Sequence, residues 1–268
     1  MATYLDGILE VHRRNASRDD RSFVELRDLA ESVPSPASLR AALEQPGLSV
    51  IAEFKRRSPS KGLLNETVDL TKMVLDYVEG GASALSVLTD EEFFGGSTGD
   101  LVTARSCTSI PILRKDFTVD ERDVCDAKIM GASAILLIVA ALDDQELTTF
   151  SRLGADLGLD VLVEVHDEQE LLRALRLDNP LLGINQRDLR SFDVDHDRVL
   201  KLIEMVPSSV VTVAESGITT NEQARVLAQA GVNGVLVGEM FMRSPDVVSA
   251  VESLSSLHAR RRGTVVNR

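Results

Sequence analysis

The sequence contains no tryptophan, only two cysteines and 4% aromatic residues among its 268 residues. Cys107 and Cys125 show no metal-ligand spacing, and two cysteines do not make the disulfide framework of a small secreted domain. We therefore expect reduced thiols in a cytoplasmic protein. No apolar run reaches the length of a membrane span, and no apolar signal-peptide segment follows the start. The pattern predicts neither secretion nor membrane insertion.

Basic residues are also scarce, with 29 Lys and Arg against 42 Asp and Glu and a formal net charge of −13. This balance argues against nucleic-acid binding and against binding to a membrane surface. The densest basic cluster, Arg260 to Arg262, lies in a polar tail that we interpret as a solvated end. What the chain does have is 44% hydrophobic residues, enough for the core of one large domain.

The first part of the chain reads as helical, with segments at 4–12, 23–31 and 37–45. From Val50 onward, short apolar runs recur every 20 to 35 residues or so, with helical periodicity in most gaps. There are eight such runs, at 50–54, 84–88, 110–114, 134–139, 160–165, 181–184, 209–214 and 234–237. Unbroken Val, Ile and Leu indicate strands buried on both faces, which is typical of parallel sheets covered by helices.

Helix boundaries are marked as well. Gly81, Gly131, Gly158 and Gly231 suit the left-handed position that ends a helix, and capping-box spacing joins Thr118 to Glu121 and Thr219 to Glu222. Eight β-then-α units favour a (β/α)8 TIM barrel over a doubly wound open sheet, since no GxGxxG follows the first strand. We predict a single barrel domain over 1–268, with 1–47 as a helical extension and 259–268 as a flexible tail.

In such a barrel, chemistry gathers at the carboxyl ends of the strands. Ionisable and amide groups stand at several of these ends: Glu53 and Lys55, Lys115, Glu164, Asn185 with Arg187, and Glu215. Glu53 and Lys55 are two residues apart, so they point to the same side of a strand. Each group alone has a structural explanation: Glu53–Lys55 as a salt bridge, Lys115 as a solvated loop charge, Ser216 as a helix cap. The convergence of two lysines, two glutamates and an amide instead indicates a site.

The last two strand ends, Ser216-Gly217 and Gly238-Glu239, each precede a predicted helix start. Free N–H groups at helix N-termini bind anions, and barrels often hold phosphate after strands seven and eight. With Lys55, Lys115 and Arg187 nearby, we expect an anionic small molecule. Glu164 and His166 have no third ligand partner, so the sequence predicts no metal site.

The chain resembles the indole-3-glycerol phosphate synthase family of tryptophan biosynthesis over residues 4–255. The motifs that carry the resemblance are IAEFKRRSPSKG, LSVLTDEEFFGGS, PILRKDF, LLIVAAL, LVEVH, GINQRDL, AESGI and VLVGE. The resemblance implies a (β/α)8 barrel with a helical segment over its active-site end. It also implies ring closure, decarboxylation and dehydration of a substrate with phosphate and carboxylate groups, without metal or organic cofactor.

By this resemblance Lys115 is the general acid, Glu164 and Glu53 are the acid–base carboxylates, and Lys55 holds the substrate carboxylate and Glu53. Asn185 is similar to the residue that orients the sugar hydroxyls, with Arg187 in support. The family's phosphate- or substrate-contacting positions correspond to Ser58, Ser216, Gly217, Gly238 and Glu239, and its apolar ring pocket corresponds to Phe94, Phe117 and Leu136. The loop after the first strand reads as a mobile rim over the substrate.

Two positions depart from the family pattern: Gln186 replaces a second Asn found in many relatives, and Glu239 follows Gly238 where some have Ser. A Glu at that position is a poor side-chain ligand for phosphate. We expect the pKa of Lys115 to be lowered by burial and by Lys55. We also expect a monomer. Rival functions for such a barrel are a sugar-phosphate isomerase, a Schiff-base aldolase that uses a barrel lysine, and a binding protein without activity.

Overall fold

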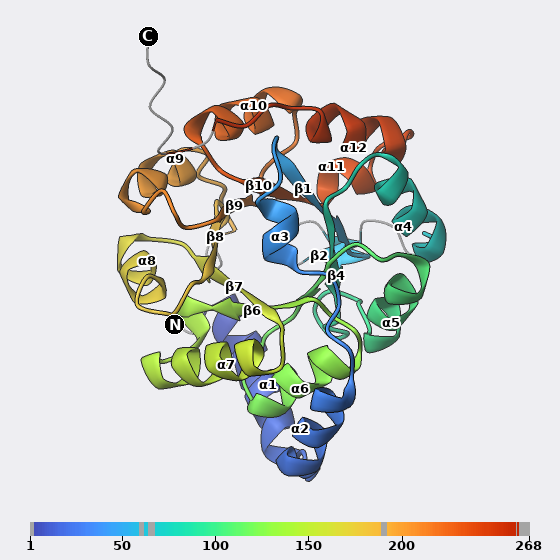
Figure 1. Cartoon of the computed structure of the whole chain (residues 1–268), viewed down its shortest axis with the longest axis vertical. Helices are drawn as coiled ribbons and strands as arrows, with labels where there is room; N and C mark the ends of the chain where they lie inside the picture. Colours follow the sequence, from blue (N-terminus) through green and yellow to red (C-terminus); the bar gives the residue numbers. More distant parts are fainter. Residues whose placement is uncertain (1–2, 59–61, 64–67, 189–191, 261, 263–268) are drawn as a thin grey trace.

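The computed structural model describes residues 3–58, 62–63, 68–188, 192–260 and 262, and these form a closed parallel barrel surrounded by helices (Figure 1). Around the barrel the strands follow the order β1-β10-β9-β8-β7-β6-β5-β4. Their bounds are β1 Ser49–Phe54, β4 Ala84–Leu88, β5 Ile112–Lys115, β6 Ala134–Ile138, β7 Asp160–Val165, β8 Leu181–Asn185, β9 Thr212–Glu215 and β10 Gly234–Val237. All eight predicted strands are confirmed. A short antiparallel pair, β2 (Arg57–Ser58) and β3 (Gly62–Leu63), follows β1.

Helices alternate with the strands and cover the outside of the barrel. They are α4 Leu70–Glu79, α5 Thr98–Cys107, α6 Glu121–Ile129, α7 Asp144–Asp156, α8 Glu168–Ala174, α9 Arg198–Leu202, α10 Asn221–Ala230 and α12 Val247–Ser255, with α11 Glu239–Met242 and two short 3-10 turns, Val139–Ala141 and Ile203–Met205. None of the helices in the described ranges is both long and apolar enough to cross a membrane.

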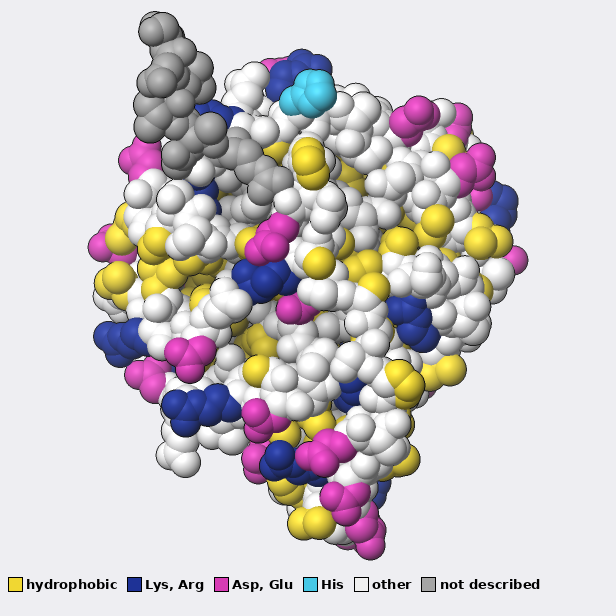
Figure 2. All heavy atoms as spheres, in the orientation of Figure 1, with side chains coloured by type: hydrophobic (Ala, Val, Ile, Leu, Met, Phe, Trp, Pro, Cys, Tyr) yellow, Lys and Arg dark blue, Asp and Glu magenta, His cyan; other side chains and the backbone are white. Residues whose placement is uncertain are grey.

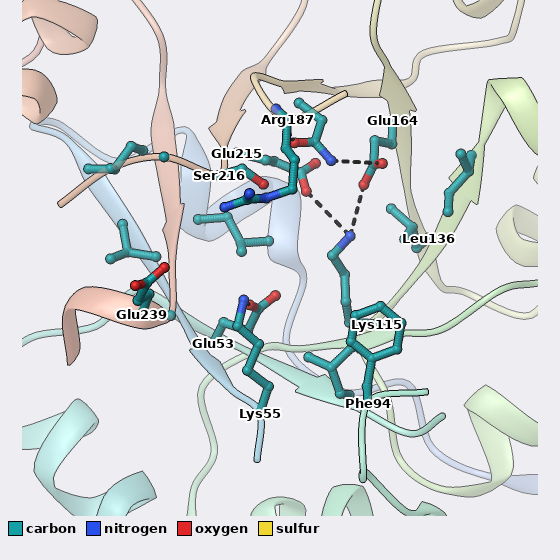
Figure 3. A pocket seen from close by; sticks show the side chains of 18 of the residues that line it. Glu53, Lys55, Phe94, Lys115, Leu136, Glu164, Arg187, Glu215, Ser216 and Glu239 are labelled. Atoms are coloured by element: carbon teal, nitrogen blue, oxygen red, sulfur yellow. Dashed lines mark hydrogen bonds and ion pairs between the residues drawn. The ribbon is translucent and has the colours of Figure 1, made fainter. Parts of the chain in front are cut away.

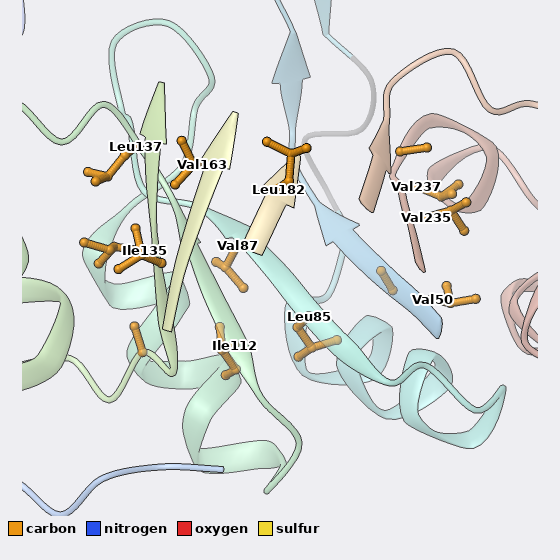
Figure 4. Close-up of a cluster of buried hydrophobic side chains, with 14 of the residues drawn as sticks. Val50, Leu85, Val87, Ile112, Ile135, Leu137, Val163, Leu182, Val235 and Val237 are labelled. Atoms are coloured by element: carbon orange, nitrogen blue, oxygen red, sulfur yellow. The ribbon is translucent and has the colours of Figure 1, made fainter. Parts of the chain in front are cut away.

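The alternation of side chains along each strand divides the core into two layers. Outward-facing residues such as Leu85, Ile135 and Val163 pack beneath the helices (Figure 4). Inward-facing residues such as Leu136 and Leu162 fill the barrel. The last inward-facing residue of each strand therefore points into the mouth of the barrel.

The three helices before β1 take three different places. Helix α1 (Tyr4–Arg18) lies at the carboxyl ends of the strands, where His12 binds Asp90, and α2 (Phe23–Ser32) packs against α6. Helix α3 (Leu39–Leu43) closes the opposite end, because Leu39 and Leu43 are fully buried in the barrel interior (Figure 1). The expectation that the helical prefix covers the active-site end therefore holds for α1 alone.

Several boundary predictions need correction. Helix α1 continues to Arg18, through a stretch that we read as polar and non-helical, because polar residues form its solvent face. The predicted capping boxes, Thr118 with Glu121 and Thr219 with Glu222, are wrong in their residues. The helices begin one or two residues later, and their capping boxes are Asp120 with Asp123 and Thr220 with Gln223. The four predicted left-handed glycines all have positive φ.

On the barrel face that shows α3, acidic and basic side chains are interspersed (Figure 2). Most of the predicted flexible tail, residues 261 and 263–268, lies outside the described residues, as do residues 59–61 of the predicted mobile rim, the loop 58–62. Arg262 is described, and its guanidinium donates to the carbonyl oxygens of Val206 and Val210 at 2.8 and 2.7 Å.

Candidate active site

A cavity opens at the carboxyl ends of the barrel strands, and it brings together nearly all of the predicted site residues (Figure 3). Its lining includes Glu53, Lys55, Phe94, Lys115, Phe117, Leu136, Glu164, Asn185, Arg187, Ser216, Gly217, Gly238 and Glu239. Ser58 ends β2, but its side chain lies outside the described part of the structure.

The first cluster of charge is the pair at the end of β1. Lys55 Nζ lies 2.5 Å from Glu53 Oε1, so the predicted salt bridge exists, and it forms part of the cavity wall. Gly238 at the end of β10 lets this pair approach, since a Cβ on Gly238 would lie only 2.8 Å from Glu53 Oε1. A side chain at this position would therefore have to displace the Glu53 carboxylate.

The second cluster centres on Lys115 at the end of β5. Its Nζ lies 2.8 Å from Glu164 Oε2 on β7 and 3.5 Å from Glu215 Oε2 on β9, which is the strand on the opposite side of the barrel (Figure 3). Asn185 Nδ2 donates to Glu164 Oε1 at 3.0 Å. Lys115 thus reaches across the mouth and joins two carboxylates that are only 1% exposed.

The role of Glu215 is the main feature that the sequence did not reveal. The sequence showed that Glu215 lies at a strand end, but it did not show that Glu215 meets Lys115. Gly183 on β8 makes room for it, since a Cβ there would lie 2.1 Å from Glu215 Oε1. Burial raises the pKa of Glu215, and the charges of Glu164 and Glu53 raise it further, whereas Lys115 lowers it. The net effect is a pKa of about 8. The surroundings of Glu215 therefore favour its protonated form more than those of an ordinary carboxyl group do.

We expect the replacement Glu215→Gln to stabilise the protein more at high pH than at low pH. Between the ordinary carboxyl pKa of about 4.3 and the folded value of about 8, the unfolded chain loses this proton first, so the wild type loses stability as pH rises. Glutamine has no such proton. Melting temperatures of both proteins at pH 5 and pH 9 test this, and an equal difference at the two pH values would contradict the raised pKa.

Lys115 and Glu164 form a mutually stabilising ion pair. Burial lowers the pKa of Lys115, but Glu164, Glu215 and Glu53 outweigh burial and raise it overall. Burial raises the pKa of Glu164, but Lys115 and His166 outweigh it and lower the pKa overall. The expectation of a lowered lysine pKa was wrong, because three carboxylates face Lys115.

One wall of the cavity is apolar. Phe94 and Phe117 lie with ring centroids 6.2 Å apart, and Leu136 extends the surface from inside the barrel. On the outer side, the ring of His12 packs against Phe117 with the ring centroids 5.2 Å apart and the planes tilted by 46°, so helix α1 supports this wall. Phe192 also lines the cavity and was missed by sequence reasoning, since it follows a loop of no clear pattern.

The loop after β8 is held by its own polar groups. The backbone N–H of Arg187 donates to Asn185 Oδ1 at 3.0 Å, and its guanidinium donates to the carbonyl of Phe192 at 2.9 Å. Gln186 Nε2 donates to the carbonyl of Ser216 at 2.7 Å, so this departure from the family pattern ties two rim loops together.

Ser216 and Gly217 both have positive φ, 63° and 72°. This turn directs the chain after β9 along the cavity, where Ile218 and Thr219 also line it. A Cβ on Gly217 would lie 2.4 Å from Val194 Cγ1, so the position requires glycine for space as well as for conformation.

His12, Asp90 and Asp116 bring three possible metal-ligand atoms within 4.8 Å of one another beside the cavity. They already have partners, since His12 Nε2 lies 2.8 Å from Asp90 Oδ2 and Arg114 lies 3.0 Å from Asp116. Burial lowers the pKa of His12, but its bond to Asp90 and nearby carboxylates raise it overall. We interpret this group as an ion-pair network that docks helix α1.

Comparison with known proteins identifies the family of this chain. The family model for indole-3-glycerol phosphate synthase matches residues 5–254. The indole-3-glycerol phosphate synthase of Aromatoleum aromaticum is 42% identical over 95% of this chain and 99% of its own, and that of Mycolicibacterium gilvum is 42% identical over 94% of both. Among solved structures, a thiamine phosphate pyrophosphorylase from Pyrococcus furiosus aligns with a TM-score of 0.58 at 21% identity, over 77% of this chain and 93% of its own, which shows the fold alone.

Proposed function

The chain belongs to the indole-3-glycerol phosphate synthase family, lyases of tryptophan biosynthesis, and we propose how its own residues carry out that reaction. The substrate is 1-(2-carboxyphenylamino)-1-deoxyribulose 5-phosphate. A carbon of its aromatic ring attacks the ketone, carbon dioxide leaves, and loss of water completes the indole ring. None of these steps is a net oxidation, so proton transfer and charge stabilisation are sufficient chemistry.

Lys115 is the general acid for ring closure. The observation that carries this assignment is its place at the centre of the mouth, within 2.8 Å of Glu164 and 3.5 Å of Glu215. The ketone oxygen becomes an alkoxide as the carbon–carbon bond forms, and an alkoxide is a stronger base than an amine. A lysine that its carboxylates keep protonated therefore still gives up its proton to this oxygen.

Glu164 and Glu53 supply the carboxylates for the later steps. Both are buried, and both touch a lysine, so each can accept a proton while its partner lysine balances the charge. Loss of water needs a base to remove a proton and an acid to assist the leaving hydroxyl. The two lysine–glutamate pairs face the same cavity and provide both kinds of group.

The remaining residues bind and orient the substrate. Lys55 holds the substrate carboxylate before it leaves as carbon dioxide, and Asn185 orients the sugar hydroxyls while it holds Glu164. The aromatic ring packs on Phe94, Phe117 and Leu136. The phosphate binds between the turn at Ser216-Gly217 and the chain at Gly238, with Arg187 nearby. Ser58 adds a contact from the loop after β1, and Glu239 turns its side chain away from the phosphate.

The phosphate assignment predicts matched losses in the variant Gly217→Ala. A Cβ at φ 72° and 2.4 Å from Val194 must displace the turn, so we expect KM to rise and inhibition by inorganic phosphate to weaken by a similar factor. Steady-state kinetics with phosphate as a competitive inhibitor measure both. Gly81→Ala, with φ 84° after α4 at the opposite end of the barrel, is the strain control. A change in KM without a matching change for phosphate would contradict the assignment. Proline at Ser216 is a poor probe, since its φ cannot reach 63°.

A Schiff-base aldolase is the alternative that the two cavity lysines leave open. Substrate and borohydride together distinguish the two functions. The synthase should release a fluorescent indole product and keep its mass, whereas an aldolase should gain the mass of a trapped substrate fragment on Lys55 or Lys115. A cytoplasmic location and a monomeric state stay predictions.

A further inference from the structure

His166 lies next to Glu164 but does not line the cavity, and the reaction described above does not use it. We propose that His166, held by Glu170, is a positioning residue that orients the Glu164 carboxylate toward Lys115 and supplies its second positive charge. This inference rests on the proposed role of Glu164 and extends it to two residues that contact no substrate.

The start of helix α8 fixes the histidine ring. Glu170 Oε2 accepts from the backbone N–H of His166 at 2.8 Å and lies 3.0 Å from His166 Nδ1. Asp167, the N-cap of α8, in turn accepts from the backbone N–H of Glu170 at 2.9 Å. Since the Glu170 carboxylate contacts both the backbone N–H and the ring Nδ1 of His166, the other ring nitrogen, Nε2, is directed toward Glu164.

Nε2 of His166 lies 3.3 Å from Glu164 Oε1, close enough for strong attraction between charges. The alignment is poor for a hydrogen bond, and Nε2 is buried without a hydrogen-bond partner among the described residues. Oε1 already accepts from Asn185 Nδ2. In the unliganded site His166 therefore acts on Glu164 mainly through its charge.

The charges alternate along this line: Glu170 negative, His166 positive, Glu164 negative, Lys115 positive. The polar groups that face the pair come from four elements, with Lys115 from β5, Asn185 from β8, Glu215 from β9 and Glu170 from α8. When Lys115 gives its proton to the substrate, Glu164 loses one of its two cations. His166 then remains to keep Glu164 a carboxylate for the next proton transfer.

Titration of His166 follows from the same contacts. Burial lowers the pKa of His166, but Glu164 and Glu170 outweigh burial and raise it to about 9. His166 is therefore cationic at neutral pH and loses its charge as the pH rises through about 9. If His166 only stabilised the start of helix α8, its ring would need no charge. The catalytic role and this purely structural role therefore predict different dependences of kcat on pH.

Nitrogen NMR of the imidazole rings tests the charge directly, because the chain has 4 histidines and His166→Gln identifies the signal of His166. We expect its pKa near 9 in the wild type. Glu170→Gln keeps an acceptor for the backbone N–H but removes the charge, so it should lower that pKa by roughly one unit. Glu168→Gln removes the same charge from an exposed position in the same helical turn and should leave the pKa unchanged.

Kinetics test the consequence for catalysis. We expect His166→Gln to lower kcat at neutral pH roughly tenfold, below the 10²- to 10⁴-fold typical of an acid or base itself, with little change in KM. The wild type should lose kcat above about pH 9, this loss should be absent in His166→Gln, and Glu170→Gln should move it to lower pH. Melting temperatures show which variants are folded at each pH.

Superimposable kcat–pH profiles for His166→Gln, Glu170→Gln and the wild type would overturn the proposal. If Glu164→Gln still abolishes activity in that case, the proposed function stands and only the role of His166 fails. A wild-type kcat in Glu164→Gln would instead overturn the proposed function itself. A neutral His166 at pH 7 would overturn the inference whatever the kinetics show.

Discussion

Replacing Lys115 with methionine is expected to lower kcat by about 10³-fold or more while KM changes little. The methionine side chain is only one heavy atom shorter, so the cavity nearly keeps its shape, but Lys115 no longer provides a proton donor near the ketone oxygen. A general acid contributes about 10² to 10⁴ in rate, and the lost positive charge also weakens stabilisation of the alkoxide. The measurement is steady-state formation of the indole product at saturating substrate.

Lys128→Met is the matched control for this experiment. Lys128 is also buried, 1% exposed, but it lies on α6 away from the cavity and donates to Ser35 Oγ at 3.0 Å. Loss of this lysine should lower stability and leave kcat unchanged. If Lys115→Met kept a kcat close to that of the wild type, Lys115 would not be the general acid.

The variant Glu164→Gln is expected to lower kcat by about 10²- to 10⁴-fold. Glutamine fills the same space, but it accepts no proton at neutral pH. Its amide also leaves Lys115 without its nearest carboxylate, so the pKa of Lys115 should fall. The residual activity should consequently decline at a lower pH than the activity of the wild type does.

A kcat–pH profile of Glu164→Gln measures both effects at once. A large loss of kcat with a basic limb at lower pH would support the ion pair as the catalytic unit. A loss confined to KM would contradict it, because Glu164 would then bind substrate and transfer no proton. Structural collapse is distinguished by the melting temperature.

Much of the site could be predicted because strand ends are marked in the sequence. Apolar runs located each strand, left-handed glycines marked the starts of four of them, and the two-residue period then placed Glu53 and Lys55 on one side. In a barrel all such ends meet at one mouth, so ionisable residues far apart in sequence could be assigned to one cavity. This is why Lys115, Glu164 and Asn185 were found.

The rest depends on distances that only the closed barrel defines. Glu215 meets Lys115 across the mouth, from the opposite strand, and its space is created by Gly183 on the strand between β7 and β9. The direction of the Lys115 pKa shift depended on how many carboxylates reach it. Sequence alone showed neither that number nor the burial that opposes it.

A helix was predicted at 37–45 and His166 was noted beside Glu164, but the place of helix α3 and the contacts of His166 were not predicted, for a similar reason. A five-residue helix gives too short a pattern to reveal that Leu39 and Leu43 close the barrel. His166 follows Glu164 by two residues and precedes Glu170 by four, but only the start of α8 turns the ring between them. Both features arise from the way elements pack on one another.

The most direct test of the account is to add 1-(2-carboxyphenylamino)-1-deoxyribulose 5-phosphate to the purified protein and follow indole fluorescence. The chain has no tryptophan, so its own emission in that range is low. We predict a rise in fluorescence with the wild type and with Lys128→Met, and almost none with Lys115→Met. Folded wild-type protein that yields no indole, or equal rates in all three proteins, would contradict it.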